Sequence, residues 1–213
     1  MSSLFATGCA LTTACTAGLM AAEWRGSQAG KWATKPLAAP GFVIAALGAG
    51  ALDSTYGQVV LAGLVLSLVG DLLLIPKSAK TFLGGLVAFL LGHVAFVVAF
   101  VVRDPDMTRL LVALPLVLLS SGLALRWLAP HVEKSMRGPV AAYVLVISAM
   151  VACAVGASGR GGGVVGLVGA LMFYASDLAV ARDRFVAHAF VNRAWGLPLY
   201  FGGQLVIAAS VAG

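Results

Sequence analysis

The sequence predicts an all-α integral membrane protein, a polytopic bundle of eight transmembrane helices. Of its 213 residues, 61% are hydrophobic and only 10% are charged, and the mean hydropathy is +1.00. An average soluble domain carries about 25% charged residues, so a soluble enzyme is excluded. The apolar runs lack the alternation of barrel strands, which leaves helices as the spanning elements. We expect a single membrane domain that covers residues 1–213.

Eight apolar runs are long enough to cross a membrane, which takes about 20 residues. Their approximate bounds are 4–22, 36–52, 57–75, 81–102, 107–127, 138–156, 162–181 and 194–211. No basic residue precedes the first run, so we expect it to be a membrane span and not a signal peptide. The connections between the runs are short and hold most of the charge.

The basic residues predict the orientation of the bundle. All but three of the 14 Lys and Arg residues lie in the first, third, fifth and seventh connections; the exceptions are Arg103, Arg109 and Arg160. Cytoplasmic connections carry the excess of Lys and Arg, so the odd connections are expected in the cytoplasm and both termini outside. The Ala-, Gly- and Val-rich composition favours a bacterial inner membrane. The net charge of +6 is therefore a topology signal and not a nucleic-acid footprint.

Several kinds of site are disfavoured by the motifs. Cys9, Cys15 and Cys153 lie in apolar runs without metal-ligand spacing, so neither a disulfide framework nor a zinc site is expected. The chain has no GxSxG, HExxH or P-loop motif, which argues against a serine lipase or a zinc protease. We expect no metal and no cofactor.

Two acids lie inside apolar runs, where a carboxyl group is costly and by default functional. Asp71 and Asp177 each lie about one turn from the cytoplasmic end of a run, and both runs cross in the same direction. If they share a site, they cannot both ionise easily and hold one proton between them. Such a pair supplies one general acid and one general base. The alternative is that both are helix-end charges beside Lys77, Lys80 or Arg182.

Other polar side chains are expected to converge on the same half of the bundle, in a pocket open to the cytoplasmic leaflet. Ser67 is one helical turn before Asp71, and His93 lies roughly 18 Å into its run, near the midplane. Each also has a structural interpretation, such as a lysine that extends to the interface or a histidine that bridges two helices. The expected substrate-binding residues are Lys35, Ser67, His93, Tyr143, Tyr200 and Gln204.

The two halves of the chain show a faint repeat. Asp71 ends the third run and Asp177 the seventh; His93 follows the first acid by 22 residues and Tyr200 the second by 23. An offset of four runs is even, so the predicted 4+4 repeat is parallel, about an axis along the membrane normal. This repeat would place both acids in equivalent positions facing one cavity.

Five stretches resemble the YhhN-like lysoplasmalogenase family. They are KPL at 35–37, GLVLSLVGDLLL at 63–74, FLGGLVAFLLGHVAF at 82–96, GALMFYASDLAVARDRF at 169–185 and YFGGQLVI at 200–207. The resemblance covers the second to fourth and the last two runs, more than half of the chain. The sixth run matches only through Pro139 and Tyr143. Phe96 and Phe201 stand where the family often has tyrosine, and neither departure touches the acids.

The resemblance implies an enzyme that hydrolyses the vinyl ether bond of lysoplasmalogens to a fatty aldehyde and glycerophosphocholine or glycerophosphoethanolamine. Cleavage starts with protonation of the outer alkene carbon, and a carboxylic acid beside a carboxylate supplies the proton and stabilises the cation. Lys35 and His93 are expected near the substrate phosphate, and Tyr200 and Gln204 near the water or the glycerol oxygens. The headgroup preference and the division of roles between the two acids stay open.

Two other functions stay open at this point. Intramembrane acids also serve as proton relays, so a proton-coupled transporter or a lipid-binding membrane protein would use the same residues. A structural membrane protein would only pair the acids with arginines. The outer half of the bundle is poor in polar residues, which favours the enzyme. The expected partners are a lysophospholipid and the bilayer, and the oligomeric state is open.

Overall fold

The computed structural model describes residues 2–76 and 78–213, and the described chain is helical with no strand. Lys77, one of the basic residues of the third connection, lies outside the described residues. The helices are α1 Ser3–Trp24, α2 Gln28–Gly48, α3 Thr55–Leu73, α4 Ala79–Val102, α5 Met107–Leu128, α6 Lys134–Ala157, α7 Gly163–Ala181, the π-helix η1 Arg182–Val186, α8 Phe190–Ala209 and the 3₁₀-helix η2 Ser210–Ala212.

Polar caps start most of the long helices. The first-turn amides of α1 to α5 donate to the side chains of Ser2, Ser27, Ser54, Ser78 and Asp106. Such caps satisfy donors that have no partner within the helix. The chain therefore marks the start of its first five long helices with a local polar signal.

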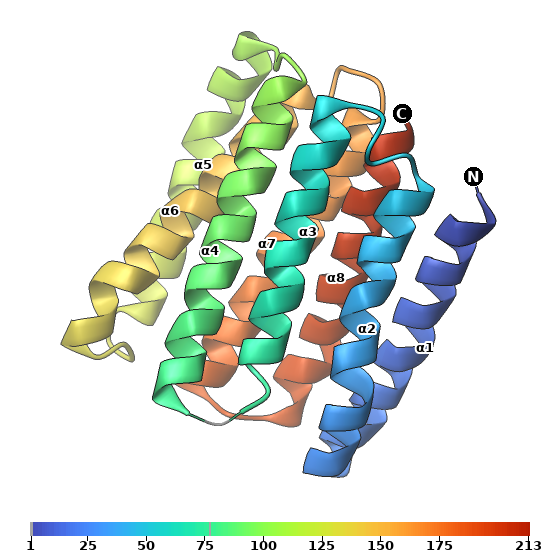
Figure 1. Cartoon of the computed structure of the whole chain (residues 1–213). Coiled ribbons are helices and arrows are strands. Elements are labelled where there is room, and N and C mark those ends of the chain that lie inside the picture. The colour runs from blue at the N-terminus through green and yellow to red at the C-terminus, as the bar shows by residue number, and fades with distance from the viewer. Residues whose placement is uncertain (1, 77) are drawn as a thin grey trace.

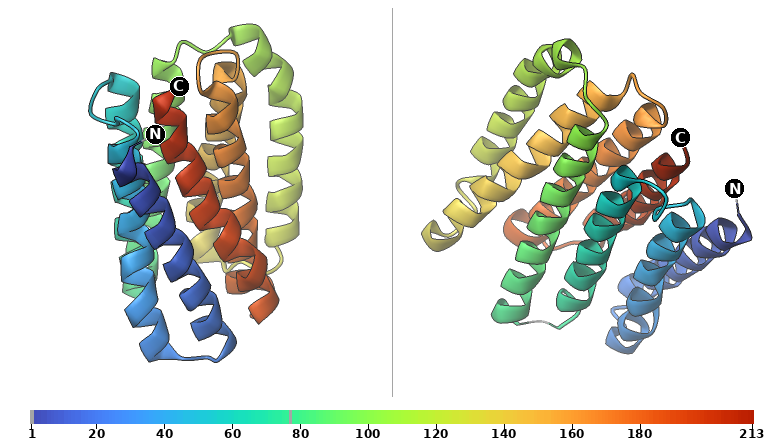
Figure 2. Two further views of the ribbon diagram at one scale, coloured as in Figure 1. Left: turned by 90° about the vertical axis from the view of Figure 1, so that its right-hand side faces the viewer. Right: turned by 45° about the horizontal axis from the view of Figure 1, so that its top comes forward.

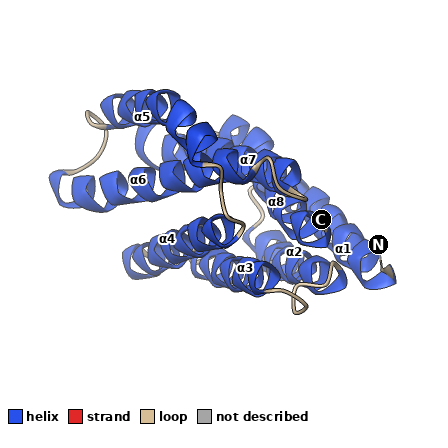
Figure 3. Cartoon of the chain, turned by 90° about the horizontal axis from the view of Figure 1, so that it is seen from above, coloured by secondary structure: helices blue, strands red, loops and turns tan. Residues whose placement is uncertain are grey.

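The eight long helices pack side by side, and each runs antiparallel to the one before it (Figure 1). Figure 2 shows α5 and α6 at one side of the bundle and α1 and α2 at the other. Seen from above, α3 and α4 lie across from α7 and α8 (Figure 3). α8 contacts both α2 and α3, and α4 contacts α6. Elements far apart in the sequence thus meet at the centre of the bundle.

Seven of the described helices are long and apolar enough to cross a membrane. The protein is therefore a polytopic helical membrane bundle, as the composition predicts. α2 is 21 residues long but is not among the seven. Lys31, Lys35, Pro36 and Pro40 lower its hydropathy.

Some helices begin earlier than the apolar runs do. α2 starts at Gln28 although the run starts near residue 36, so Pro36 lies inside the helix and does not open it. α6 and α8 also start four residues before their runs. Hydropathy detects only the part of a helix that is apolar, whereas backbone hydrogen bonds continue into polar residues beyond it.

Glycines allow close backbone approach where α3 meets α4 and where α7 meets α8. A Cβ atom at Gly92 would lie 3.2 Å from the carbonyl oxygen of Gly63, and one at Gly203 would lie 3.1 Å from that of Gly169. Small residues serve this purpose in membrane helices generally. Gly63 and Gly169 each precede one of the two acids by eight residues, so both acids are carried by a helix that a glycine contact anchors.

Candidate active site

The first acid lies among three helices. Asp71 is two residues before the end of α3, and its side chain is buried. Tyr200 of α8 donates a hydrogen bond to its Oδ2 atom over 2.6 Å, and Nζ of Lys35, on α2, lies 3.2 Å from Oδ1. A phenol and an ammonium group are both donors, and such charge-assisted hydrogen bonds are strongest to an ionised carboxylate.

The second acid has a different set of partners. Asp177 lies four residues before the end of α7. Tyr143 of α6 donates to its Oδ2 atom over 2.8 Å, and Nε2 of His93, on α4, lies 3.4 Å from the same oxygen. Within the described residues, no Lys or Arg lies within ion-pair distance of this carboxyl group. The Asp177 cluster (Tyr143, Asp177 and His93) therefore contains no permanent cation.

The hydrogen bond at the other ring nitrogen fixes the tautomer of His93. Its Nδ1 atom lies 2.7 Å from the carbonyl oxygen of Phe89, which only accepts, so Nδ1 carries a hydrogen. In the neutral ring Nε2 then holds a lone pair. Nε2 is buried and has no hydrogen-bond partner in the described part of the chain, although it is within ion-pair distance of Asp177. A proton on either group would complete this contact.

Aromatic rings link the two acid clusters, and the sequence analysis missed them. The centroid of the Phe173 ring lies 4.4 Å from that of His93 and 5.3 Å from that of Tyr200, and the centroids of the Phe89 and Tyr200 rings lie 5.8 Å apart. Phe173 is four residues before Asp177 and Phe89 four before His93, a spacing that places both rings on the faces of the site residues. That spacing is the signal that could have found them.

The two carboxyl groups do not contact each other directly. No hydrogen bond between Asp71 and Asp177 occurs among the described residues, and each keeps the partners given above. The side chains of Lys35 and Asp177 are 16% and 17% exposed. Those of Asp71 and His93 are 3% and 1% exposed. Access to the site is therefore at Lys35 and Asp177.

Two of the expected substrate-binding residues are buried without contacting either acid by a hydrogen bond. The hydroxyl of Ser67 donates to the carbonyl oxygen of Gly63 over 2.9 Å, within its own helix. Gln204 is fully buried, and neither its amide nitrogen nor its amide oxygen has a partner in the described chain. An unpaired buried amide is costly and is usually explained by a water or ligand.

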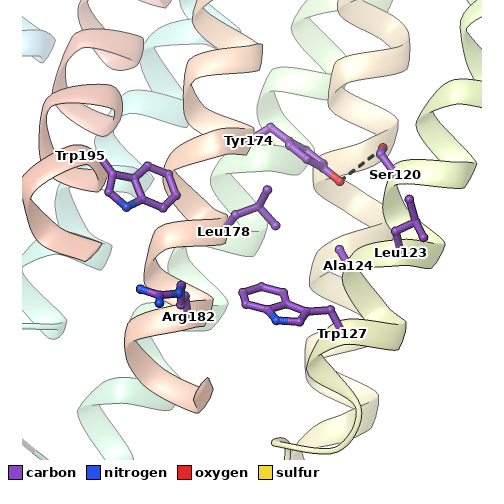
Figure 4. Close-up of a pocket in the computed structure, with 8 residues that line it drawn as sticks. All are labelled: Ser120, Leu123, Ala124, Trp127, Tyr174, Leu178, Arg182 and Trp195. Carbon is purple, nitrogen blue, oxygen red and sulfur yellow. Dashed lines mark hydrogen bonds between the residues drawn. The ribbon is translucent and has the colours of Figure 1, made fainter. Parts of the chain in front are cut away.

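A pocket of about 360 Å³ opens elsewhere on the bundle, and we call it the α5–α7 groove (Figure 4). Its lining is Ser120, Leu123, Ala124, Trp127, Tyr174, Leu178, Arg182 and Trp195. None of these is an expected site residue, so the groove is not the predicted pocket around the acids. Across the described residues, no group of three or more His, Cys, Asp and Glu side chains could hold a metal ion.

Fold and site together define a multi-pass helical membrane protein with one buried and one half-buried acid near one end of its bundle. The YhhN family model matches residues 30–211, which is most of the chain. The protein belongs to the YhhN family. No solved structure matches it.

Curated relatives share about a third of the aligned residues. Lysoplasmalogenase TMEM86A of Bos taurus is 31% identical over 157 residues, 71% of this chain and 64% of the relative. Lysoplasmalogenase TMEM86B of Homo sapiens is 34% identical over 160 residues, 73% of this chain and 64% of the relative. A lysoplasmalogenase of Mycobacterium tuberculosis (strain CDC 1551 / Oshkosh) is 35% identical over 155 residues, 68% of this chain and 57% of the relative. The chain thus spans less than two thirds of the length of these relatives.

Proposed function

We propose that the protein is a membrane-embedded lysoplasmalogenase that hydrolyses the vinyl ether bond of lysoplasmalogens. The products are a fatty aldehyde and glycerophosphocholine or glycerophosphoethanolamine. The observation that carries the proposal is the pair of acids with unlike partners: Asp71 faces the Lys35 ammonium group, and Asp177 faces Tyr143 and His93, with no Lys or Arg beside it in the described part of the chain. The names of the relatives supply the reaction class, since all of them are lysoplasmalogenases.

The unlike partners support a division of roles that the sequence left open. The His93–Asp177 contact needs one proton, and an apolar environment favours the uncharged form, with the proton on the carboxyl group. Lys35 neutralises Asp71 as a carboxylate. We therefore assign Asp177 as the general acid and Asp71 as the carboxylate that stabilises positive charge and accepts a proton from water.

The reaction needs no further protein group. Asp177 donates its proton to the outer alkene carbon, and the ether oxygen and its carbon become an oxocarbenium ion. Water adds to that carbon and loses a proton to a carboxylate, which gives a hemiacetal. The bond between the hemiacetal carbon and the glycerol oxygen then breaks: Asp71 returns the proton that it took from water to the glycerol oxygen, the hemiacetal hydroxyl loses its proton to Asp177, and the fatty aldehyde leaves. One water is consumed, and the proton count of the protein is restored. A well-placed general acid contributes about 10²–10⁴ in rate.

The remaining expected residues are proposed to hold the substrate. An ammonium group has three donors, so Lys35 has donors left for a phosphate oxygen while it pairs with Asp71. Gln204 is one turn from Tyr200 on α8, and its unpaired amide suits the attacking water or a glycerol oxygen. Ser67 lies one turn before Asp71 on α3 and lines the same side of that helix.

We also propose that α2 crosses the membrane, which makes eight spans in one domain. The first residue of α1 and the last residue of α8 lie at the same end of the bundle in Figure 1, as an even number of crossings requires. The odd connections carry most of the basic residues and are assigned to the cytoplasm, with both termini outside. The membrane is assigned as the bacterial inner membrane. A reporter that fluoresces only in the cytoplasm, fused after α8, should stay dark.

The contacts of the two acids support the 4+4 parallel repeat. Asp71 on α3 takes Lys35 from the preceding helix and Tyr200 from the last helix of the other half. Asp177 on α7 takes Tyr143 from the preceding helix and His93 from the last helix of the other half. Exchanging α1–α4 with α5–α8 maps one set of helices onto the other, as a pseudo-two-fold axis would.

The function is tested by incubating the purified protein with a 1-alkenyl lysophospholipid and with its ester counterpart. We expect aldehyde from the alkenyl lipid and no fatty acid from the ester lipid, because only the vinyl ether forms a stabilised cation when protonated. Absence of aldehyde with folded protein would overturn the proposal. Proton-coupled lipid uptake into vesicles without hydrolysis would favour the alternative, a transporter or lipid-binding protein that uses the same acids.

A further inference from the structure

The α5–α7 groove is apolar along its length and polar only at its two ends (Figure 4). Leu123 and Ala124 come from α5 and Leu178 from α7. At one end the hydroxyl of Tyr174 donates to Oγ of Ser120 over 3.5 Å, which joins α7 to α5. At the other end of the groove lies the guanidinium group of Arg182.

The charge of Arg182 has no acidic partner within the described residues. The guanidinium group hydrogen-bonds to the amide oxygen of Asn192, which is neutral. The adjacent acid, Asp183, pairs with Arg193 and His188 instead. A cation therefore lies at the mouth of an apolar groove with its charge available to an anion.

Two tryptophans at this mouth favour a position at the level of lipid headgroups. Trp127 lies at the end of α5 and Trp195 near the start of α8, and each keeps 37% of its surface exposed. Tryptophan is enriched where a bilayer meets water, because its ring is amphipathic. An arginine at that depth is at the height of lipid phosphates, and the groove below it is at the height of their alkyl chains.

We propose that the α5–α7 groove binds a single-chain phospholipid, with the phosphate on Arg182 and the alkyl chain along Leu123, Leu178 and the tryptophans. The volume of about 360 Å³ is at the small end of ligand pockets, which suits one chain. Tyr174 and Leu178 of α7 and Arg182, the first residue of η1, follow each other at intervals of four residues, and neither Asp71 nor Asp177 is among the residues that line the groove. The groove is therefore a lipid site separate from the acids, and it does not depend on hydrolysis.

The tryptophans of the groove report on the site directly. The background protein for this experiment carries Trp24→Phe and Trp32→Phe, so that its fluorescence comes from Trp127 and Trp195, the other two of the four tryptophans. It is titrated in detergent with an ester lysophosphatidylcholine brominated in its chain. We expect saturable quenching. Arg182→Gln should raise the half-saturating concentration about tenfold, the loss of one charge-assisted contact.

Two controls separate phosphate recognition from damage to the fold. Arg126→Gln removes a charge at the same end of α5 outside the groove and should leave the curve unchanged. A brominated monoacylglycerol lacks the phosphate and should bind wild type and Arg182→Gln alike. Quenching that never saturates, or an equal effect of both arginine variants, would overturn the proposal.

A second pair of variants does not depend on the arginine. Ala124→Phe fills the groove and should abolish saturable quenching, whereas Leu116→Phe, on the exposed face of the same helix, should not. Retained binding in Ala124→Phe would contradict the site. The probe is an ester lipid, so loss of aldehyde release in the enzyme assay leaves this result intact, and the two proposals fail independently.

Discussion

Each of the two acid clusters takes one partner from the preceding helix and one from the other half of the chain, but among the described residues only the Asp71 cluster contains a lysine. Around Asp71 the partners are a phenol and an ammonium group, and around Asp177 they are a phenol and an imidazole. The tyrosines are alike, so the difference rests on Lys35 against His93. The same residue type thus meets an ammonium group in one half of the chain and an imidazole in the other. The neighbouring helices, and not the acid itself, decide which carboxyl group has a lysine as its partner.

The largest expected effect comes from removing either acid. Asp71→Asn and Asp177→Asn should each lower aldehyde release by about 10²–10⁴, because one loses the carboxylate and the other the proton donor. Initial rates of aldehyde formation by purified variants measure this. Asp53→Asn, in the exposed connection before α3, is the matched control. Near wild-type turnover in either active-site variant would rule out the two-acid mechanism.

The next largest expected effect is a difference between the two clusters in how much a substitution lowers the free energy of unfolding. Lys35→Met leaves Asp71 as a buried charge without a cationic partner and should cost about 3 kcal/mol, the lower end for broken buried pairs, because Lys35 is partly exposed and Tyr200 still donates to the carboxylate. Asp177→Asn leaves no charge behind and should cost less than about 1 kcal/mol. Unfolding of the purified protein in mixed micelles measures both.

The double variant Lys35→Met/Asp71→Asn tests the cause of that loss. It removes both charges and should recover most of the stability that Lys35→Met loses. Equal destabilisation by Asp177→Asn and Lys35→Met would mean that the two clusters do not differ in charge.

Substituting the two tyrosines should also lower the free energy of unfolding more in the Asp71 cluster than in the Asp177 cluster, by a smaller margin. Tyr200→Phe removes a hydrogen bond to a carboxylate and should cost about 2 kcal/mol, whereas Tyr143→Phe removes one to an uncharged carboxyl group and should cost about 1 kcal/mol. Unfolding under the same micelle conditions gives both values. The reverse order would exchange the roles assigned to Asp71 and Asp177.

The smallest expected effect is the infrared band of a single protonated carboxyl group, and its measurement needs no substrate. Infrared difference spectra at neutral pH should contain the carbonyl stretch of one protonated carboxyl group, which disappears in Asp177→Asn and persists in Asp71→Asn. His93→Gln should shift this band because it changes the partner of the carboxyl group. A band that disappears in Asp71→Asn instead would refute the division of roles while leaving the hydrolase proposal standing.

Much of the fold was predictable because its signals are local. An apolar run of sufficient length is visible in composition, and the sequence predicted helices at all eight positions with errors mainly at their polar ends. Counting residues to the end of a run also predicted that Asp71 and Asp177 lie near the ends of their helices, and they lie two and four residues before the ends of α3 and α7. The second helix was harder, because its lysines and prolines lower the hydropathy of a segment that the bundle still packs as a helix.

By itself the sequence determined a helical membrane protein with an acid near the end of its third and of its seventh apolar run, since hydropathy and residue spacing are properties of single segments. Only the tertiary structure decided that Lys35 faces Asp71 and His93 faces Asp177. That choice depends on how each helix is rotated about its axis, and close contacts such as Gly63 with Gly92 and Gly169 with Gly203 constrain the rotation. Contacts between helices far apart in the chain produce no local sequence pattern. The partner that distinguishes Asp71 from Asp177 is therefore seen only once the bundle is assembled.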